Sequence, residues 1–189
     1  MKIPRSLEVA YLLGRLERLA RSGVNVGGLN PAQWEALRYL ARANRFSRTP
    51  AALADYLGST RGTVSQTLIA LEQKGLARRS ASRRDGRSVE LALTPRGEAL
   101  LKQDHIHDLA RDIAAGTGDD AADLLAALQA VLRATIARNE GRAFGVCHTC
   151  RHFHCDVRPG AASPHHCGLL DEPLSRADSE AICQEQEIA

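Results

Sequence analysis

Apolar residues recur at helical spacing over most of residues 4–139, and this spacing predicts a series of short helices. The first helix is expected over residues 4–22. The next two begin at Asn30 and Thr49, because each of these capping side chains is followed by a proline, which favours the first helical turn. The first part of the chain is therefore predicted to be mainly helical.

A fourth helix follows the third after a short turn. Gly58 ends the third helix, Ser59 or Thr60 caps the fourth, and Gly75 stops it. The predicted inner face of the fourth helix is apolar and consists of Val64, Leu68 and Leu71. Its first turns therefore direct polar side chains outward, namely Arg61, Thr63, Ser65 and Gln66.

The periodicity then changes from helical to alternating. Val89, Leu91 and Leu93 alternate with polar residues, which predicts a half-buried strand, and residues 76–79 supply its partner. The Asp85–Gly86 dipeptide between them is a strong signal for a hairpin. The hairpin loop is long and basic, with Arg83, Arg84 and Arg87.

Two longer helices complete this part of the chain. One begins at Thr94 and is expected to continue past Ile113, and the other begins at Asp119 or Asp120 and ends at Gly141. The fold class that follows is mainly α with a small β-hairpin.

Composition and charge narrow the class of protein. The 189 residues are 44% hydrophobic and 25% charged, as in an ordinary globular protein. The net charge is only +3, but residues 61–96 hold eight basic and three acidic side chains, whereas residues 140–189 hold four basic and eight acidic ones. The basic middle predicts a polyanionic partner. Neither a signal peptide nor a membrane-spanning stretch is apparent, so we expect a cytoplasmic protein without a membrane partner.

The order of a short helix, a turn, a second helix and an arginine-rich hairpin is that of a winged helix-turn-helix. Outward polar side chains on the second helix suit the major groove of DNA, and a basic ribbon suits the neighbouring minor groove or its phosphates. The motifs are, in order, LADYL (residues 53–57), TVSQ (63–66), LEQKGL (71–76), DGR (85–87) and LTPRG (93–97). Together they resemble the MarR family of bacterial transcriptional regulators over roughly residues 5–139.

The resemblance implies a homodimer, formed through the first and the last two helices, that binds a palindromic operator, most often as a repressor. It also implies that Asp85 and Arg87 shape the wing tip, and it allows for a small-molecule effector between the dimerisation and DNA-binding parts. We assign the DNA contacts to Arg61, Thr63, Ser65, Gln66, Arg83, Arg84 and Arg87. The alternative is a winged helix that binds another protein instead of DNA. No catalytic constellation is apparent, so an enzyme is not expected.

The cysteines define a second part of the chain. All five lie after residue 146, which divides the chain into a winged-helix and dimerisation domain, residues 1–140, and a cysteine-rich module, residues 141–189. Cys147 and Cys150 form a chelating pair, and Cys167 and Cys183 follow at wide spacing. Four thiolates suit a zinc ion or a four-iron cluster, and a metal would stabilise a module with few apolar residues.

This ligand order, with Phe153 three residues after the pair, is similar to that of high-potential iron–sulfur proteins. We therefore expect the four cysteines Cys147, Cys150, Cys167 and Cys183 to hold an iron–sulfur cluster of the 4Fe-4S type, with zinc as the alternative cofactor. A reversible disulfide between Cys147 and Cys150 is a third interpretation. Cys155 is an alternative ligand in place of Cys183.

The surroundings of the cysteines complete the prediction. His165 and His166 are expected near the metal or at the surface rather than as ligands. An apolar shell is expected from Phe144, Phe153, Leu169, Leu170 and Ile182. The module begins directly after the last dimerisation helix, so a change at the metal is expected to shift that helix and thereby make operator binding sensitive to redox or iron status.

Overall fold

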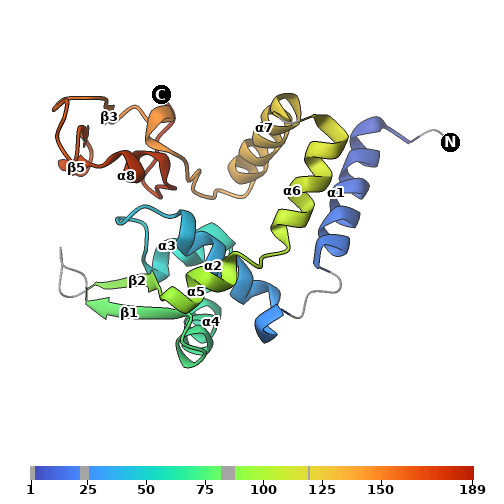
Figure 1. Ribbon diagram of the computed structural model, residues 1–189. Coiled ribbons are helices and arrows are strands. Elements are labelled where there is room, and N and C mark those ends of the chain that lie inside the picture. The colour runs from blue at the N-terminus through green and yellow to red at the C-terminus, as the bar shows by residue number, and fades with distance from the viewer. Residues whose placement is uncertain (1–2, 22–25, 82–87, 119) are drawn as a thin grey trace.

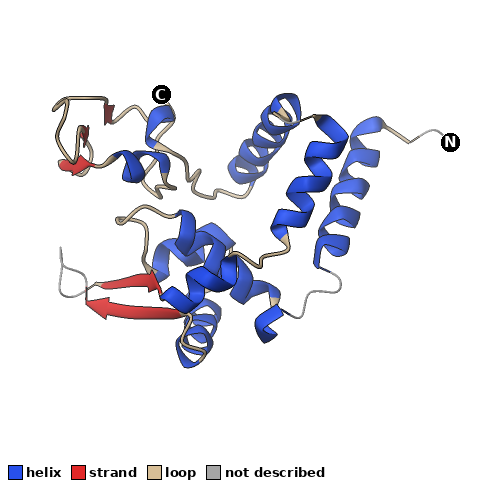
Figure 2. Ribbon diagram, in the orientation of Figure 1, coloured by secondary structure: helices blue, strands red, loops and turns tan. Residues whose placement is uncertain are grey.

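The computed structural model describes residues 3–21, 26–81, 88–118 and 120–189, and helices dominate it (Figures 1 and 2). The first part contains α1 (Arg5–Arg21), η1 (Val26–Gly28), α2 (Pro31–Arg42), α3 (Pro50–Leu57), α4 (Arg61–Gln73), β1 (Ala77–Ala81), β2 (Val89–Leu93), α5 (Pro95–Leu101), α6 (Ile106–Thr117) and α7 (Ala122–Arg138). The second part contains η2 (Cys147–Thr149), β3 (Phe153–His154), β4 (His165–Cys167), β5 (Glu172–Leu174) and α8 (Arg176–Glu180). The predicted fold class, mainly α with a small β-hairpin, is confirmed.

The helix starts predicted at Asn30, Thr49 and Thr94 are confirmed by capping hydrogen bonds, whereas α7 begins at Ala122, after Ala121 and not at Asp119 or Asp120. The side chain of Asn30 accepts from the Gln33 amide at 2.9 Å, and the Gln33 side chain accepts from the Asn30 amide at 3.2 Å, which closes a capping box at α2. Thr49 caps α3, and Thr60 rather than Ser59 caps α4. These caps position α3 and α4, the two helices of the helix-turn-helix.

The core lies between α2, α3, α4 and the hairpin. Its largest completely buried side chains include Tyr39, Leu37, Leu40, Leu53, Leu68, Leu71 and Leu91. β1 and β2 pair antiparallel, with Arg79 opposite Leu91. β2 contacts the core through Leu91, which is buried, and Leu93, which is half-buried and packs against the core, whereas Val89 is 39% exposed. The predicted half-buried strand is therefore confirmed at Leu91 and Leu93, and the prediction was wrong at Val89.

The helix predicted to run from Thr94 past Ile113 is in fact two helices, α5 and α6. The break lies at Asp104, which is buried and whose carboxylate accepts two hydrogen bonds from Arg38 of α2, each of 2.7 Å. The same carboxylate accepts from the Ile106 amide at 3.0 Å and so starts α6 anew. A contact with a residue far away in the sequence thus overrides the helical periodicity.

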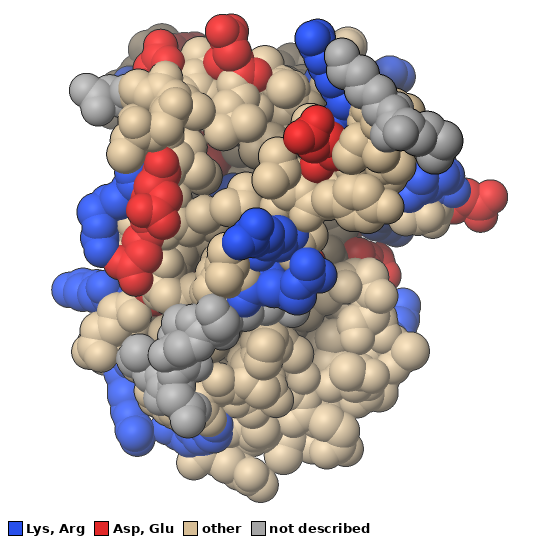
Figure 3. All heavy atoms as spheres, turned by 90° about the vertical axis from the view of Figure 1, so that its right-hand side faces the viewer, with Lys and Arg blue, Asp and Glu red and all other residues tan. Residues whose placement is uncertain are grey.

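α1, α6 and α7 lie to one side of the winged helix (Figure 1), and they contribute little to its core. None of the described residues of α6 and α7 is buried. Uncharged residues make up most of the face shown in Figure 3, which is the side of α1. Large apolar side chains of these helices remain exposed, among them Leu12, Leu16, Leu19, Leu125, Val131 and Leu132. Within the described residues, no helix combines the length and the apolarity needed to cross a membrane.

The cysteine-rich module packs against the winged helix. Its sheet has the antiparallel order β3-β4-β5. Ile182 belongs to the core of the winged helix, and the ring of Phe144 lies 6.2 Å from that of Tyr39. From the other side, Phe46 packs with Cys147 and Leu174. The two parts of the chain therefore share apolar contacts in both directions.

Candidate functional site

The first candidate surface is the exposed side of α4. Val64, Leu68 and Leu71 are buried, as predicted, so α4 presents its opposite side to solvent. Of the predicted DNA-contacting residues, three are exposed and Ser65 is half-buried; the exposed ones are Arg61, Thr63 and Gln66. The structure places these side chains within the first two turns of one helix.

The hairpin is fastened to α4 by one arginine. Arg79 of β1 donates from Nη2 to the Ser65 carbonyl at 3.2 Å, and its Nε lies 3.2 Å from a carboxylate oxygen of Glu72. Arg78, on the same strand, is exposed, and the sequence analysis did not single it out. The predicted wing arginines, Arg83, Arg84 and Arg87, lie outside the described residues.

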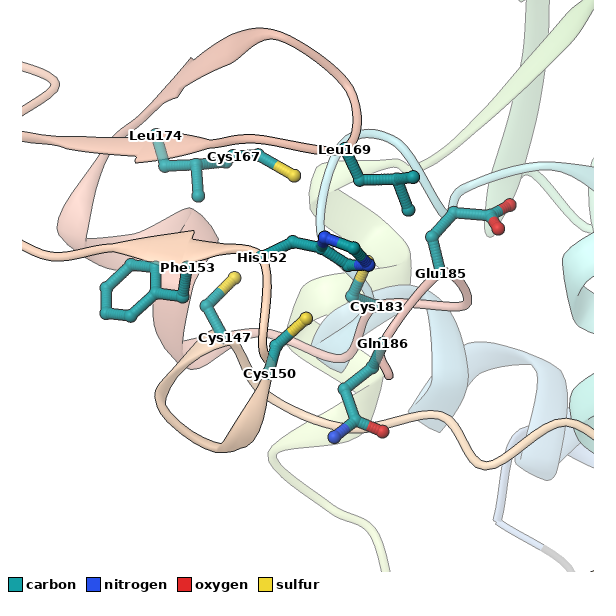
Figure 4. A pocket seen from close by; sticks show the side chains of 10 residues that line it. All are labelled: Cys147, Cys150, His152, Phe153, Cys167, Leu169, Leu174, Cys183, Glu185 and Gln186. Carbon is teal, nitrogen blue, oxygen red and sulfur yellow. The ribbon is translucent and has the colours of Figure 1, made fainter. Parts of the chain in front are cut away.

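The second candidate site is a small pocket in the cysteine-rich module. Four of the five cysteines line it, and they are the four predicted ligands Cys147, Cys150, Cys167 and Cys183. Figure 4 shows the sulfurs of Cys147 and Cys150 directed into the space below Cys167, with Cys183 beside the ring of His152. Three separate segments of the chain thus bring their cysteines to one place.

Local backbone hydrogen bonds explain how each cysteine is held. Cys147 begins η2, and the Cys150 amide donates to the Cys147 carbonyl at 2.9 Å, so the pair closes one tight turn. Cys167 lies on β4 opposite Phe153. Cys183 exchanges two backbone hydrogen bonds with Gly145, of 2.8 and 3.2 Å.

Cys155 lies apart from this pocket. It is exposed, and its sulfur belongs to a group with Asp156 and His165 in which the three donor atoms lie within 4.8 Å of one another. It is the one such group among the described residues, so no three of the four pocket sulfurs approach one another that closely. The structure thus separates Cys155 from the other four cysteines.

The electrostatics of the pocket disfavour free thiolates. The pKa of Cys147 is raised to about 12. Burial is the largest cause, and the neighbouring thiols of Cys183, Cys167 and Cys150 add to it. Burial also raises the pKa of Cys183, although contacts from Asn44 and Ser47 oppose this. A cation that bound Cys147 and Cys183 would therefore displace their protons.

The surroundings of the pocket match the prediction in part. Phe153 and Leu169 line the pocket, and Leu170 packs beside it. Phe144 and Ile182, however, pack against the winged-helix core. The expected apolar shell was therefore wrong for these two residues, because their segments fasten the module to the winged helix.

Sequence reasoning missed three polar residues that line the pocket: His152, Glu185 and Gln186. The buried Nε2 of His152 makes no hydrogen bond to any described residue, although Glu187 Oε2 lies 3.2 Å away. His165 and His166, which the sequence analysis considered, are not among the lining residues. The position of His152 two residues after Cys150 was the only available signal, and by itself it identifies no site.

A second, more open pocket lies where η1, the end of α4 and α5 meet. Lys74, Arg96 and Leu100 are among its lining residues. Lys74 donates from Nζ to the Gly28 carbonyl, also in the lining, at 2.6 Å. Its combination of basic and apolar groups suits a small anionic molecule.

The comparisons with known proteins agree with the first candidate surface. Residues 27–88, less than half of the chain, match the sequence model of the MarR family. A structure of the S. aureus MepR–DNA complex is similar over 71% of this chain and 99% of that one, with a TM-score of 0.56 and 19% identity. For the transcriptional regulator BldR from Sulfolobus solfataricus the values are 70%, 98%, 0.55 and 21%.

A third structure is the transcriptional repressor CouR bound to a 23-mer DNA duplex. It is similar over 68% of this chain and 97% of that one, with a TM-score of 0.50 and 28% identity. No curated protein matches the chain. The fold and the matched segment define a winged helix-turn-helix of the MarR type. The matched family and the structures of BldR and CouR are those of transcriptional regulators.

Proposed function

We propose that this chain is a transcriptional regulator that binds double-stranded DNA. The observation that carries the proposal is the exposed first half of α4, with Arg61, Thr63 and Gln66 available to base edges, on a fold that also occurs in the DNA-bound structures of MepR and CouR. The arginines of the hairpin loop would contact the phosphates beside it.

The regulator acts as a homodimer on a palindromic operator, and represses transcription there. The support is the apolar surface of α1 and α7, which the described chain leaves uncovered. A second copy of the chain covers such a surface. It also provides a second copy of α4, the recognition or reading helix, which a palindromic site requires.

The four-cysteine pocket holds a metal centre, for which we favour an iron–sulfur cluster over zinc. A tetrahedral zinc site brings its sulfurs to roughly 3.8 Å from one another, as follows from a Zn–S bond of about 2.3 Å. No three pocket sulfurs lie within 4.8 Å of one another, and a four-iron cluster holds its cysteines further apart than one ion does. Phe153, Leu169 and Leu174 supply apolar side chains to the lining of the pocket.

A cluster at this place makes the regulator responsive to redox or iron status, because thiolate-bound iron is lost or oxidised more easily than zinc. The open pocket beside Lys74 and Arg96 offers a place for a small anionic effector. Neither role requires a catalytic step by this chain.

Two measurements on protein purified without oxygen test these proposals. In a gel-shift assay with a palindromic DNA fragment from upstream of the gene for this protein, the retardation should weaken steeply as the salt concentration is raised. A failure to retard any DNA favours a winged helix that binds another protein. About four iron and four sulfide ions per chain would support the iron–sulfur cluster, and about one zinc ion per chain would support a zinc site. Protein that contains neither metal would favour the reversible disulfide.

A further inference from the structure

The turn between α2 and α3 contacts the cysteine pocket directly. Its first residue, Ala43, forms a parallel bridge with Ile182, the neighbour of Cys183. The Asn44 amide donates to the Ile182 carbonyl at 2.8 Å, and the Ile182 amide donates to the Arg42 carbonyl at 2.7 Å. The segment that carries Cys183 is thus hydrogen-bonded to the winged helix as an additional short strand.

Ser47 lies at the centre of this contact. Its side chain is completely buried, and its Oγ accepts from the Gln184 amide at 2.9 Å. Its carbonyl accepts from the Tyr39 hydroxyl at 2.6 Å, which anchors the turn on α2. The side chains of Ser47 and Asn44 also contact the Cys183 thiol. A displacement of Cys183 therefore cannot leave the hydrogen bonds of Ser47 unchanged.

The opposite side of the same turn holds the wing. The Arg48 carbonyl accepts from the Leu91 amide at 2.7 Å, and Leu91 is the buried centre of β2. Arg48 also donates from Nε to the Ala43 carbonyl at 3.0 Å, which closes the turn on itself. Thr49, the next residue, caps α3. The turn therefore connects the cysteine pocket with both the wing strand and the helix-turn-helix.

We propose that the turn formed by residues 43–49 transmits the state of the four-cysteine centre to the wing, with Ser47 as the positioning residue. This inference rests on the proposed function and specifies its regulation. It replaces the route through α7 expected from the sequence. None of the described residues of α7 is buried, so a shift of α7 would disturb few contacts with the core. The segment of Cys183 and the strand β2 both pack against this turn. Close packing favours a few discrete positions of the wing over a continuous range of positions.

Hydrogen exchange on the complete chain tests the route without any substitution. The amide of Leu91 is compared in the metal-loaded protein and in protein emptied by a chelator under the same conditions. We expect its protection to fall at least about fivefold on emptying, together with that of the Gln184 amide. An unchanged Leu91 amide, or a change confined to α7, overturns the proposal.

A pair of serine variants tests Ser47 itself. Ser47→Ala removes the acceptor of the Gln184 amide. Ser179→Ala is the control: it removes a similarly buried hydroxyl of the cysteine-rich module, which donates within α8 to the Arg176 carbonyl. Both variants should retain metal and dimerise. In Ser47→Ala the ratio of operator affinities between loaded and emptied protein should fall below about twofold, while Ser179→Ala retains at least about fivefold.

The outcomes separate this proposal from the proposed function. Equal behaviour of the two serine variants overturns the role of Ser47, and if Ser47→Ala does not fold, the exchange of the Leu91 amide in the unaltered chain decides. Metal-bearing protein that binds DNA but shows an unchanged Leu91 amide refutes the route alone. Protein that contains neither iron nor zinc refutes the metal centre, and the route falls with it.

Discussion

At the residue scale, the four pocket cysteines differ from Cys155 in what surrounds their sulfurs. Cys147 and Cys183 are buried next to further thiols, whereas Cys155 is exposed. Burial and the neighbouring thiols raise the pKa of Cys147, so a cation that bound there would have to displace its proton and would then offset the repulsion between thiolates. This arrangement agrees with the proposed metal centre in the pocket and with the exclusion of Cys155 from it.

Substitutions of single cysteines should follow this division. Cys147→Ser and Cys183→Ser should lose most of the bound iron or zinc, because a hydroxyl is a weak ligand for either metal. Cys155→Ser is the matched control and should retain the metal content of the unaltered chain. Metal counted per chain, together with the visible absorption spectrum, checks the prediction. Loss of metal in Cys155→Ser alone would show that the four ligands are chosen wrongly.

Asp104 makes a second prediction at this scale. Burial acts to raise the pKa of Asp104, but hydrogen bonds from Arg38 and from the Ile106 amide, with the charge of Arg38, outweigh it and lower the pKa. A carboxyl group with a lowered pKa stabilises the fold above its ordinary pKa of about 3.9, and this contribution is lost as the pH falls through the folded-state value. The unaltered protein should therefore lose stability below about pH 4.

Asp104→Asn removes the buried carboxylate and leaves Arg38 with Glu35 as its acidic partner. The free energy of unfolding at pH 7 should fall by about 3 kcal/mol, and the difference from the unaltered chain should shrink in acid. Asp108→Asn is the control, since Asp108 pairs with Arg111 at the surface, where a pair contributes little. Urea unfolding at pH 7 and in acid measures both. Equal losses in the two variants would contradict the assigned role of Asp104.

At the element scale, α4 and the wing should affect DNA binding differently. Arg61→Ala and Gln66→Ala remove exposed side chains of the reading helix, so the affinity for the operator should fall by about 1–3 kcal/mol while non-specific affinity changes less. Lys102→Ala, at the end of α5, removes an exposed basic residue that belongs to neither α4 nor the hairpin and serves as the control. Titrations with operator and unrelated DNA give both affinities. Similar losses of affinity for operator and unrelated DNA would indicate that α4 contacts the DNA phosphate backbone and not the bases.

The wing arginines should instead act through the phosphates. Arg84→Ala and Arg87→Ala should weaken binding about equally on all sequences, and each should reduce the slope of log affinity against log salt by about one. Binding curves at four or more salt concentrations measure the slope. A slope that stays the same in both variants would mean that the wing does not contact phosphates.

The same scale shows why much of the fold was predictable from the sequence. Helix starts at Asn30 and Thr49 depend on side chains within three residues of the helix, and these are visible in sequence. The inner face of α4 follows from its periodicity. The pocket cysteines were predictable because ligand spacing is itself a pattern.

Features that depend on distant contacts were not predictable. The break between α5 and α6 is caused by Asp104, whose partner Arg38 lies 66 positions away in the sequence. The docking of Ile182 on the winged helix is likewise a long-range contact without a local pattern. His152 reaches the pocket only because β3 and β4 fold over η2. Local rules identify elements and ligands, and tertiary contacts decide how these parts are joined.

At the scale of the whole molecule, the acidic module turns part of its charge toward basic residues of the winged helix. Arg45 lies 3.7 Å from a carboxylate oxygen of Glu172 and 3.9 Å from one of Asp178. A third pair has the opposite sense, because Arg142 of the module lies 3.6 Å from a carboxylate oxygen of Asp55 on α3. The residues of the winged helix in these pairs belong to the α2–α3 turn and to α3, and none of the three pairs involves α4.

The apolar surfaces of α1 and α7 make the last prediction. Leu16 is 47% and Leu132 is 57% exposed, although both belong to continuous apolar helix faces. Burial of such a face against a second copy would stabilise the dimer by about 25 cal/mol per Å² of apolar surface. The unaltered protein should therefore be a dimer at micromolar concentration by light scattering, and a monomer would contradict the proposed assembly.

Charged substitutions on these faces should separate the dimer and weaken operator binding together. Leu16→Glu and Leu132→Glu should produce monomers, whereas Val157→Glu, at a position 51% exposed in the cysteine-rich module, should leave the dimer intact. A monomer presents one reading helix and cannot contact two half-sites about 34 Å apart, so operator affinity should approach non-specific affinity while metal content stays unchanged. Monomers that still bind the full operator tightly would show that one copy of the chain suffices.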